Sequence, residues 1–312
     1  MARDVILDCD VGIDDALAIM LALGSRELRI RAITTVCGNA EVEKTSENAL
    51  KVLEAFDVRD ISVARGQGQP LKRELYTAGH VHGSDGLGDS RLPKPELKLD
   101  SRHAVDVIIE EAERGDLHLI CTGPLTNLAS ALSKAPRLAR RLQDVVIMGG
   151  AFMLTPYGFG NVTPVSEFNM FVDPDAAKMV FNAGVPLTVV GLDVTTNPSA
   201  TLTRDRYQRI VGAETRGAKF LKRISQKLMN SWGSFSLHDP MAVAYAIDPT
   251  LLTVDEYPVD VETDGTITRG QTIADRRPWK EVMEFKSTAR IAYGVDGPRF
   301  LRIFEERAIK NL

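Results

Sequence analysis

The sequence predicts an α/β fold in which a single domain, residues 1–312, is built on a mainly parallel central sheet flanked by helices. Short apolar runs alternate with amphipathic stretches along most of the chain. Runs that are apolar throughout and are separated by helices are typical of parallel strands covered on both faces. No Pro/Gly/Ser-rich linker, repeat or low-complexity run interrupts the alternation, which favours one domain over two.

The predicted elements follow one another in a regular order. We interpret the apolar runs as strands and the amphipathic stretches as helices. In chain order these are strand 5–10, helix 14–25, strand 30–38, helix 41–56, strand 61–66, a long polar loop, helix 102–115, strand 117–123, helix 124–135, strand 144–150, helix 174–184 and strand 185–194. Ligands of such sheets bind at the carboxyl ends of the strands, so polar residues that follow strands are the first candidates for a site.

Composition narrows the class of protein. The chain has 312 residues, 44% of them hydrophobic, which is enough for a substantial core. The formal net charge of −4 arises from interspersed charges, and the lack of a basic stripe argues against a nucleic-acid partner. No signal-peptide pattern or apolar run of bilayer length is present, so we expect a cytoplasmic protein without a membrane partner. We expect reduced, buried thiols at Cys9, Cys37 and Cys121.

The densest group of charges is the segment DCDVGIDD, residues 8–15, at the end of the first predicted strand. Its carboxylates belong to Asp8, Asp10, Asp14 and Asp15. One or two of them are explained if they cap the following helix, whose N-terminus favours negative charge. Capping does not explain all of them, because neighbouring carboxylates repel one another. Oxygen-rich clusters suit a hard cation such as calcium or magnesium, so we favour a metal or polar-ligand site over capping alone.

Polar residues follow two other predicted strands. Asn39 comes after the second strand, and Thr126 and Asn127 come after the fourth. Each is an ordinary turn residue when it is taken alone. Their recurrence indicates a shared site, because the carboxyl ends of these strands converge in space.

Segment 160–177, GNVTPVSEFNMFVDPDAA, is rich in hydrogen-bonding side chains. It holds Asn161, Glu167 and Asn169, a set of donors and acceptors that suits sugar hydroxyls. A loop with Asx turns that leads into a helix explains the same residues, and the segment alone does not separate the two interpretations.

Two histidines are candidates for chemistry. His238 precedes Asp239 at the start of an apolar helix, and a carboxylate supports an imidazole that donates a proton near neutral pH. Taken alone, the pair is better explained as a helix cap beside a surface histidine. His82 lies in a glycine-rich loop, which is either a mobile cover over a site or simply a loop. The neighbouring His80 has no distinct argument.

Five segments together resemble a known family: DCDVGIDDALAIMLAL, HGSDGLG, TGPLTNLASAL, GNVTPVSEFNMFVDPDAA and HDPMAVAYAIDP. Their order resembles that of the nucleoside hydrolases, the inosine-uridine-preferring ribohydrolases, from about Asp8 to Asp248. The resemblance implies a Rossmann-like nucleoside hydrolase fold, a tightly bound calcium ion, and hydrolysis of the N-glycosidic bond of a ribonucleoside to free base and ribose. The residues after Asp248 carry no signature of the family.

The resemblance also implies roles for individual residues. The calcium ligands are Asp10, Asp15, the main-chain carbonyl of Thr126, and Asp239. Asp10 is the general base that acts on the attacking water, and His238 is the acid that protonates the leaving base. On this interpretation the acidic cluster exists because the cation requires it.

The implied substrate contacts divide between the ribose and the base. The 2′- and 3′-hydroxyls are bound by Asp14, Asn39 and Asn169, the 5′-hydroxyl by Asn161, Glu167 and the backbone at Met153, and the base by His82. A site built around these hydroxyls predicts strong discrimination against 2′-deoxynucleosides. Members of the family are often dimers or tetramers, so we expect a homodimer or homotetramer.

The sequence leaves the base preference open. Trp232 and Phe235 are spaced to stack on a base, but ordinary core packing explains the same spacing, and we favour it. Two other kinds of protein accommodate the acidic cluster, namely a metal-dependent phosphatase and a nucleoside binder without catalysis. No P-loop and no Lys/Arg set after the acidic motif supports the phosphatase. The sequence contains all of the candidate residues Asp10, Asp15, Asp239 and His238, which argues against a nucleoside binder without catalysis.

Overall fold

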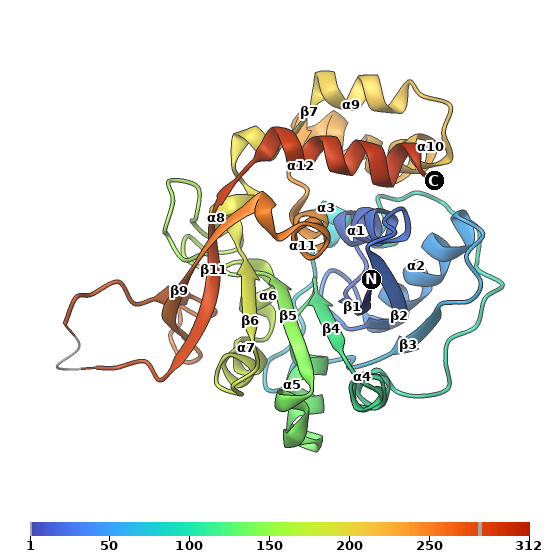
Figure 1. The fold of residues 1–312 in the computed structure, drawn as a ribbon. Helices are drawn as coiled ribbons and strands as arrows, with labels where there is room; N and C mark the ends of the chain where they lie inside the picture. The colour runs from blue at the N-terminus through green and yellow to red at the C-terminus, as the bar shows by residue number, and fades with distance from the viewer. Residues whose placement is uncertain (1, 280–282) are drawn as a thin grey trace.

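The predicted strands pair into a central sheet in the computed structural model, which describes residues 2–279 and 283–312. Its strands are β1 Arg3–Cys9, β2 Leu28–Thr35, β3 Ser62–Arg65, β4 Leu117–Cys121, β5 Leu142–Met148, β6 Leu187–Val190, β9 Leu252–Val261, β10 Thr272–Ala274 and β11 Ser287–Val295. Over the described residues they lie in the order β10-β9-β11-β6-β5-β4-β1-β2-β3 (Figure 1). The short strands β7 Leu202–Thr203 and β8 Ser234–Phe235 form a separate antiparallel pair.

Helices alternate with the strands in the first two thirds of the chain. The α-helices of the described residues are α1 Ile13–Leu23, α2 Val42–Ala55, α3 Gly79–His82, α4 Ala104–Arg114, α5 Thr126–Lys134, α6 Phe168–Val172, α7 Pro174–Phe181, α8 Leu192–Thr195, α9 Arg204–Val211, α10 Arg216–Trp232, α11 His238–Ile247 and α12 Gly297–Phe304. Each predicted helix is present, with its ends within one helical turn of the prediction. The predicted α/β fold with a mainly parallel, helix-flanked sheet is confirmed.

The two faces of the sheet carry separate hydrophobic clusters. Along β1, Val5, Leu7 and Cys9 belong to one cluster and Ile6 to the other, as the alternation of side chains along a strand requires. Helices α1, α2, α10, α11 and α12 cover the first cluster, and α4, α5 and α7 cover the second (Figure 1). Both faces are therefore buried, which explains why the parallel strands are apolar along most of their length.

The order of the strands places a crevice between β1 and β4. Strand β1 pairs in parallel with β2 on one side and with β4 on the other. The chain runs outward from β1 through β2 to β3, and then returns to the other side of β1 to begin β4. Ligands of open α/β sheets bind at such a reversal, outside the carboxyl ends of the strands. Asp10 follows β1 at this point, and Thr122 follows β4.

Each predicted strand ends earlier in the structure than the sequence predicts, and the largest difference is in β6. The strand expected over 185–194 stops at Val190, and the chain turns into the short helix α8. The reason is Asp193, whose carboxylate accepts hydrogen bonds from the backbone N–H groups of Phe152, at 2.8 Å, and Leu154, at 2.6 Å. These bonds satisfy the amides of a neighbouring loop and draw Asp193 out of the strand direction. The predicted polar loop before α4 also contains a short helix, α3.

The described part of the last sixty residues extends the sheet and covers one of its faces. Strand β11 pairs in parallel with β6 and in antiparallel with β9, and β9 pairs in antiparallel with β10. Helix α12 inserts Phe300 and Phe304 into the first hydrophobic cluster, where both are fully buried. This part of the chain therefore contributes to the core.

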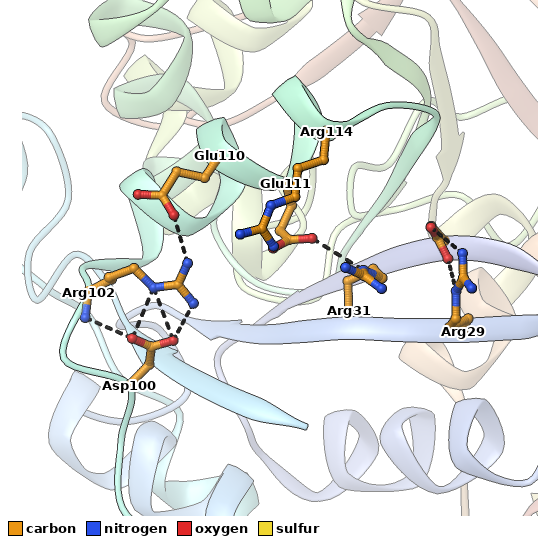
Figure 2. A network of polar contacts seen from close by, with 8 residues as sticks. Arg29, Arg31, Asp100, Arg102, Glu110, Glu111 and Arg114 are labelled. Carbon is orange, nitrogen blue, oxygen red and sulfur yellow. Dashed lines mark hydrogen bonds and ion pairs between the residues drawn. The ribbon is translucent and has the colours of Figure 1, made fainter. Parts of the chain in front are cut away.

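Ion pairs fasten α4 to the side of the sheet that carries β2 (Figure 2). Arg31 on β2 pairs with Glu111 on α4, with 3.2 Å between Nε and Oε2. Arg102 pairs with Asp100 at 2.5 Å and with Glu110 at 2.7 Å. Exposed pairs of this kind contribute little to stability, and at Glu111, which is only 7% exposed, the loss of hydration offsets part of the attraction.

Two further findings concern the cysteines and the search for a helix that could span a membrane. Cys9, Cys37 and Cys121 are buried free thiols, as predicted. No described helix combines the length and the apolar character that crossing a bilayer requires.

Candidate active site

A cavity of about 630 Å³ lies at the carboxyl ends of the central strands. It is lined by residues that follow β1, β2, β4 and β5, together with the starts of α6 and α11 and the end of α10. Eight of the residues that the sequence singles out line it: Asp14, Asn39, His82, Asn161, Glu167, Asn169, His238 and Asp239. Among its described lining residues there is no lysine or arginine. The cavity therefore gathers segments that are distant in the sequence around carboxylates, amides and imidazoles.

Carboxylates crowd together at one side of this cavity. One oxygen each from Asp14, Asp15 and Asp239 lies within 4.8 Å of the others. The first turn of α1 supplies two of them, and the first turn of α11 supplies the third. Burial and the neighbouring charge of Asp14 together raise the pKa of Asp15 to about 6. Such a group of acids is stabilised by a cation, which removes both the repulsion and the loss of hydration.

Asp10 is fully buried beside this group, and its electrostatic coupling to Asp15 raises its pKa in addition to the effect of burial. One of its oxygens, Oδ2, accepts a 2.7 Å hydrogen bond from the backbone N–H of Asn39. The other, Oδ1, is buried and has no hydrogen-bond partner among the described residues. A side chain at Gly38 would meet Oδ2 at 2.0 Å, so the glycine is what permits this close approach. An unpartnered buried carboxylate oxygen beside other acids matches the chemistry of a calcium site.

Asn39 and Thr122 hold Asp15 in place. The carboxylate of Asp15 accepts hydrogen bonds from Asn39 Nδ2 at 3.1 Å and from Thr122 Oγ1 at 2.7 Å. It also accepts the backbone N–H of Gly12, at 2.9 Å, at the start of α1. One acid of the cluster therefore does act as a cap, as the simple alternative requires, but it shares this task with a place in the carboxylate group. Sequence analysis missed Thr122, although its position directly after β4 is the relevant signal.

Asp8 and Thr126 lie outside the cavity wall. Asp8 Oδ1 accepts hydrogen bonds from Thr34 Oγ1 at 2.6 Å and from Asn127 Nδ2 at 2.8 Å, so it ties β1 to its neighbours. Thr126 begins α5, and its hydroxyl donates to Asp173 Oδ2 at 2.8 Å. Both residues are buried. The first acid of the DCDVGIDD segment is thus engaged within the sheet.

The segment before α6 caps that helix and also lines the cavity. The Glu167 carboxylate accepts backbone N–H groups from Gly150 at 3.0 Å, Asn169 at 2.9 Å and Met170 at 3.2 Å. This capping role agrees with the alternative interpretation of the segment as a loop that leads into a helix. Glu167, Asn161 and Asn169 nevertheless all line the cavity. An ionised carboxylate has about four acceptor positions, so one remains for a ligand hydroxyl.

Asn169 and Met153, two further predicted sugar-binding residues, differ in their relation to the cavity. Asn169 donates through Nδ2 to the carbonyls of Thr122, at 2.8 Å, and Met148, at 3.1 Å. Its side-chain oxygen Oδ1 is therefore the polar atom that is left to contact a ligand. Met153 is not part of the cavity wall among the described residues, and its side chain is 41% exposed. Its backbone adopts a left-handed conformation with φ of 55°, and its N–H donates to Gly158.

The two candidate histidines both face the cavity. His238 Nδ1 lies 2.8 Å from Thr195 Oγ1; burial lowers the pKa of this imidazole, and the charge of Asp14 opposes that effect. The helix-cap interpretation is wrong, because Leu237 occupies the N-cap position of α11 and Asp239 lies within the first turn. His82 Nδ1 accepts the backbone N–H of Ile13 at 3.0 Å, and burial lowers its pKa to about 4. His82 is therefore neutral near pH 7.

Aromatic and aliphatic residues also line the cavity. The expectation of core packing is wrong for Trp232, which is 59% exposed and lines the cavity beside Leu228. It holds for Phe235, which is 6% exposed and packs edge-on against Tyr207 with ring centroids 6.4 Å apart, although it reaches the cavity as well. The difference arises because α10 ends at Trp232, so the indole lies beyond the last packed turn.

Comparisons with known proteins agree with this geometry. A family model described as inosine-uridine preferring nucleoside hydrolase matches residues 5–302. The chain is 43% identical over 286 residues to the inosine-uridine preferring nucleoside hydrolase of Leishmania major, with 89% of each chain covered. It is 38% identical over 310 residues to the pyrimidine-specific ribonucleoside hydrolase RihA of Shewanella sp. (strain MR-7), covering 96% of this chain and 94% of that one. Its fold is similar to that of a plant nucleoside hydrolase, with a TM-score of 0.92, 32% identity and 99% of both chains covered.

Proposed function

Because the chain belongs to the inosine-uridine preferring nucleoside hydrolase family and is a ribonucleoside hydrolase, we propose that it breaks the N-glycosidic bond with a calcium ion held by its carboxylate cluster. The observation that carries this proposal is the buried, unpartnered Oδ1 of Asp10 beside the Asp14, Asp15 and Asp239 group. A set of hard oxygen donors with raised pKa values supports a divalent cation such as calcium.

The residues that would hold the ion are Asp10, Asp15, Asp239 and the main-chain carbonyl of Thr126. When bound, calcium neutralises the carboxylates and orients both the attacking water and the ribose diol. The carboxylates proposed as ligands differ in one member from the group whose oxygens lie within 4.8 Å of one another. That group contains Asp14 in place of Asp10. We assign Asp14 to the sugar because it lines the cavity, whereas Asp10 is fully buried.

The protein's own groups then carry the protons. Asp10 accepts a proton from the attacking water while the water oxygen forms its bond to C1′ of the ribose. The C1′–N bond breaks, its electron pair stays on the base nitrogen, and His238 supplies the proton that this nitrogen takes up. Positive charge that develops on the ribose is stabilised by the surrounding carboxylates. Burial lowers the pKa of His238, and the charge of Asp14 opposes this effect and favours the protonated form that the step uses.

The remaining polar residues bind the sugar. We assign Asp14, Asn39 and Asn169 to the 2′- and 3′-hydroxyls, and Asn161, Glu167 and the backbone at Met153 to the 5′-hydroxyl. All of these except Met153 line the cavity, which supports the assignment. We assign His82 to the base, because its Nδ1 is engaged with Ile13 and a neutral ring then presents Nε2–H as a donor. The described lining residues include no lysine or arginine to bind a phosphate group, which disfavours the phosphatase alternative.

Ribose release tests the proposal. Inosine, adenosine, guanosine, uridine and cytidine are incubated with the protein, with and without a chelator strong enough to remove calcium. We expect release that the chelator abolishes and added calcium restores. Release that continues unchanged after calcium is removed would contradict the proposed metal. The rank order of the substrates measures the base preference, on which the named relatives themselves differ.

A further inference from the structure

The cavity has one wall built from two segments that are distant in the sequence. Residues 78–82, which include α3, form one part of this wall. Residues 228–236, at the end of α10 and beyond, form the other. The loop 83–91 continues from the first part and reaches α10, so it connects the two.

Two basic side chains of α10 bind this loop. Lys227 Nζ lies 2.5 Å from Asp89 Oδ2. Arg223 donates from Nε to the carbonyl of Ser90 at 2.9 Å and from Nη2 to the carbonyl of Arg91 at 2.8 Å. Three consecutive residues of the loop are therefore held by two residues that lie one helical turn apart on the same face of α10.

The loop is docked in a conformation that requires such support. Gly88, with φ of +73°, lies so close to α10 that a side chain there would meet the Ile224 carbonyl at 1.8 Å. Asp89 and Arg91 have φ of 53° and 52°. This left-handed region is disfavoured for residues that carry a Cβ, so hydrogen bonds must stabilise it. Within the loop, Asp85 Oδ1 accepts the backbone N–H groups of Leu87 at 2.7 Å and Asp89 at 2.8 Å. Further contacts come from α10. Lys227 and Arg223 supply those contacts at the same residues.

The loop in turn holds His82. Asp89 Oδ1 accepts both the backbone N–H and the hydroxyl of Ser84, each at 2.8 Å, which closes the loop on itself. The backbone N–H of Gly88 donates to the carbonyl of His82 at 2.7 Å. His82 then accepts the N–H of Ile13 at the acidic end of α1. A continuous series of contacts thus runs from the basic residues of α10 to the catalytic side of the cavity.

We propose that Arg223 and Lys227 are positioning residues that set the loop 83–91 and, through it, the place of His82 in the cavity wall. The inference rests on the proposed function, in which this wall contacts the base. The Lys227 side chain is 66% exposed and that of Asp89 is 31% exposed, and exposed ion pairs contribute little to global stability. Loss of the pair is therefore expected to loosen one wall while the protein stays folded.

The experiment compares Lys227→Met and Arg223→Met with Lys227→Arg and with a matched control, Lys219→Met. Lys219 lies on the same helix and pairs with Glu214 at 2.9 Å, on residues that do not line the cavity. Two quantities are measured on the calcium-loaded protein: hydrogen exchange of the loop 83–91, and KM and kcat for inosine and uridine.

We expect both methionine variants to exchange faster in the loop and to show KM raised roughly two- to fivefold, with kcat nearly unchanged. This is the loss expected for an exposed ion pair at Lys227, and the net loss of hydrogen bonds to carbonyls at Arg223 is of similar size. Lys227→Arg and Lys219→Met should match the wild type. Raised ionic strength should increase the KM of the wild type and have little effect on Lys227→Met, because salt screens the pair.

Exchange and KM that match the wild type in both methionine variants would overturn the inference. So would an equal change in Lys219→Met, because the effect would then belong to the helix charge and not to the loop. Failure of the proposed function is recognised separately: the wild type would release no ribose, while the exchange measurement would still decide whether Arg223 and Lys227 hold the loop.

Discussion

Asp10 shows how a single side chain is placed for reactivity at the expense of stability. It is fully buried, one of its oxygens lacks a partner among the described residues, and the charge of Asp15 raises its pKa. Folding gathers these acids even though each would be better hydrated in the unfolded chain. Functional sites commonly hold such locally unfavourable groups, and the surrounding core offsets the loss.

Replacement of Asp10 by asparagine separates the two effects. We expect Asp10→Asn to lower kcat by about 10²- to 10⁴-fold, because the general base is lost. The same change should raise the melting temperature of the calcium-free protein, because it removes a buried negative charge from the cluster. Ribose release and thermal melting measure the two effects. A variant that is inactive and also less stable without calcium would contradict this account of Asp10.

His238 is tested through the leaving group. We expect His238→Ala to lower kcat for inosine by about 10²- to 10⁴-fold, because the departing purine requires a proton. p-Nitrophenyl riboside has a leaving group that requires no proton, so its hydrolysis should be nearly unaffected. Parallel assays of the two substrates provide the control within one variant. An equal loss on both would show that His238 has another role.

The hydroxyl-binding residues predict the choice of sugar. Polar side chains that bind the 2′-hydroxyl stay buried and unpaired when that hydroxyl is missing. We therefore expect kcat/KM for 2′-deoxyuridine to be lower than for uridine by a factor of about 10⁴. The comparison uses the same base, so only the sugar differs. Comparable turnover of thymidine and uridine would also argue against these contacts.

Among the elements, α1 and α11 matter most because their first turns carry the acids of the site. Asp15 accepts the N–H of Gly12 at the start of α1, and Asp239 lies in the first turn of α11. A helix N-terminus favours negative charge, so these positions reduce part of the repulsion before any cation binds. The strands contribute differently: β1 and β4 end at the same edge of the sheet, which brings Asp10 and Thr122 to one place.

The C-terminal helix α12 gives a test of an element that sequence patterns did not identify. Phe300 is fully buried in the first hydrophobic cluster, whereas Arg302 on the same helix is exposed. We expect Phe300→Ala to lower the free energy of unfolding by about 3–5 kcal/mol, through lost burial and a residual cavity. Arg302→Ala should change it by less than about 0.5 kcal/mol. Urea unfolding of both variants measures the difference, and equal midpoints would show that α12 is not part of the core.

For the whole molecule, the site exists only when distant segments have folded together. Its carboxylates come from residues 10–15 and from Asp239, and the cavity also includes the segments around Asn161 and His238. An ion that binds this arrangement binds the folded protein and not the unfolded chain. Its binding energy is therefore added to the stability of the fold.

Calcium removal tests this coupling. We expect the melting temperature to fall when calcium is removed by a chelator and to recover when calcium is restored. A free calcium concentration 100 times the dissociation constant corresponds to about 2.7 kcal/mol of added stability. Thermal melting of Asp239→Asn serves as the control, because this variant should respond much less to calcium. Equal melting temperatures with and without calcium in the wild type would exclude a site in this cluster.

The sequence already specifies the alternating strands and helices, because the period of apolar residues and the composition are local properties of the chain. It also determined the acidic motif at 8–15 and the polar residues after later strands, since residues that follow parallel strands meet at one edge. The family resemblance was visible in the same segments, and the match over residues 5–302 confirms it.

The folded arrangement alone shows which of these residues meet and which partners each one has. It separated Asp8, bound within the sheet, from Asp10, which keeps an unpartnered oxygen. It showed Trp232 exposed at the cavity, and it turned the chain into α8 at Asp193 to satisfy a neighbouring loop. These outcomes depend on contacts between segments far apart in the chain, and such contacts leave no periodic or compositional trace in the local sequence.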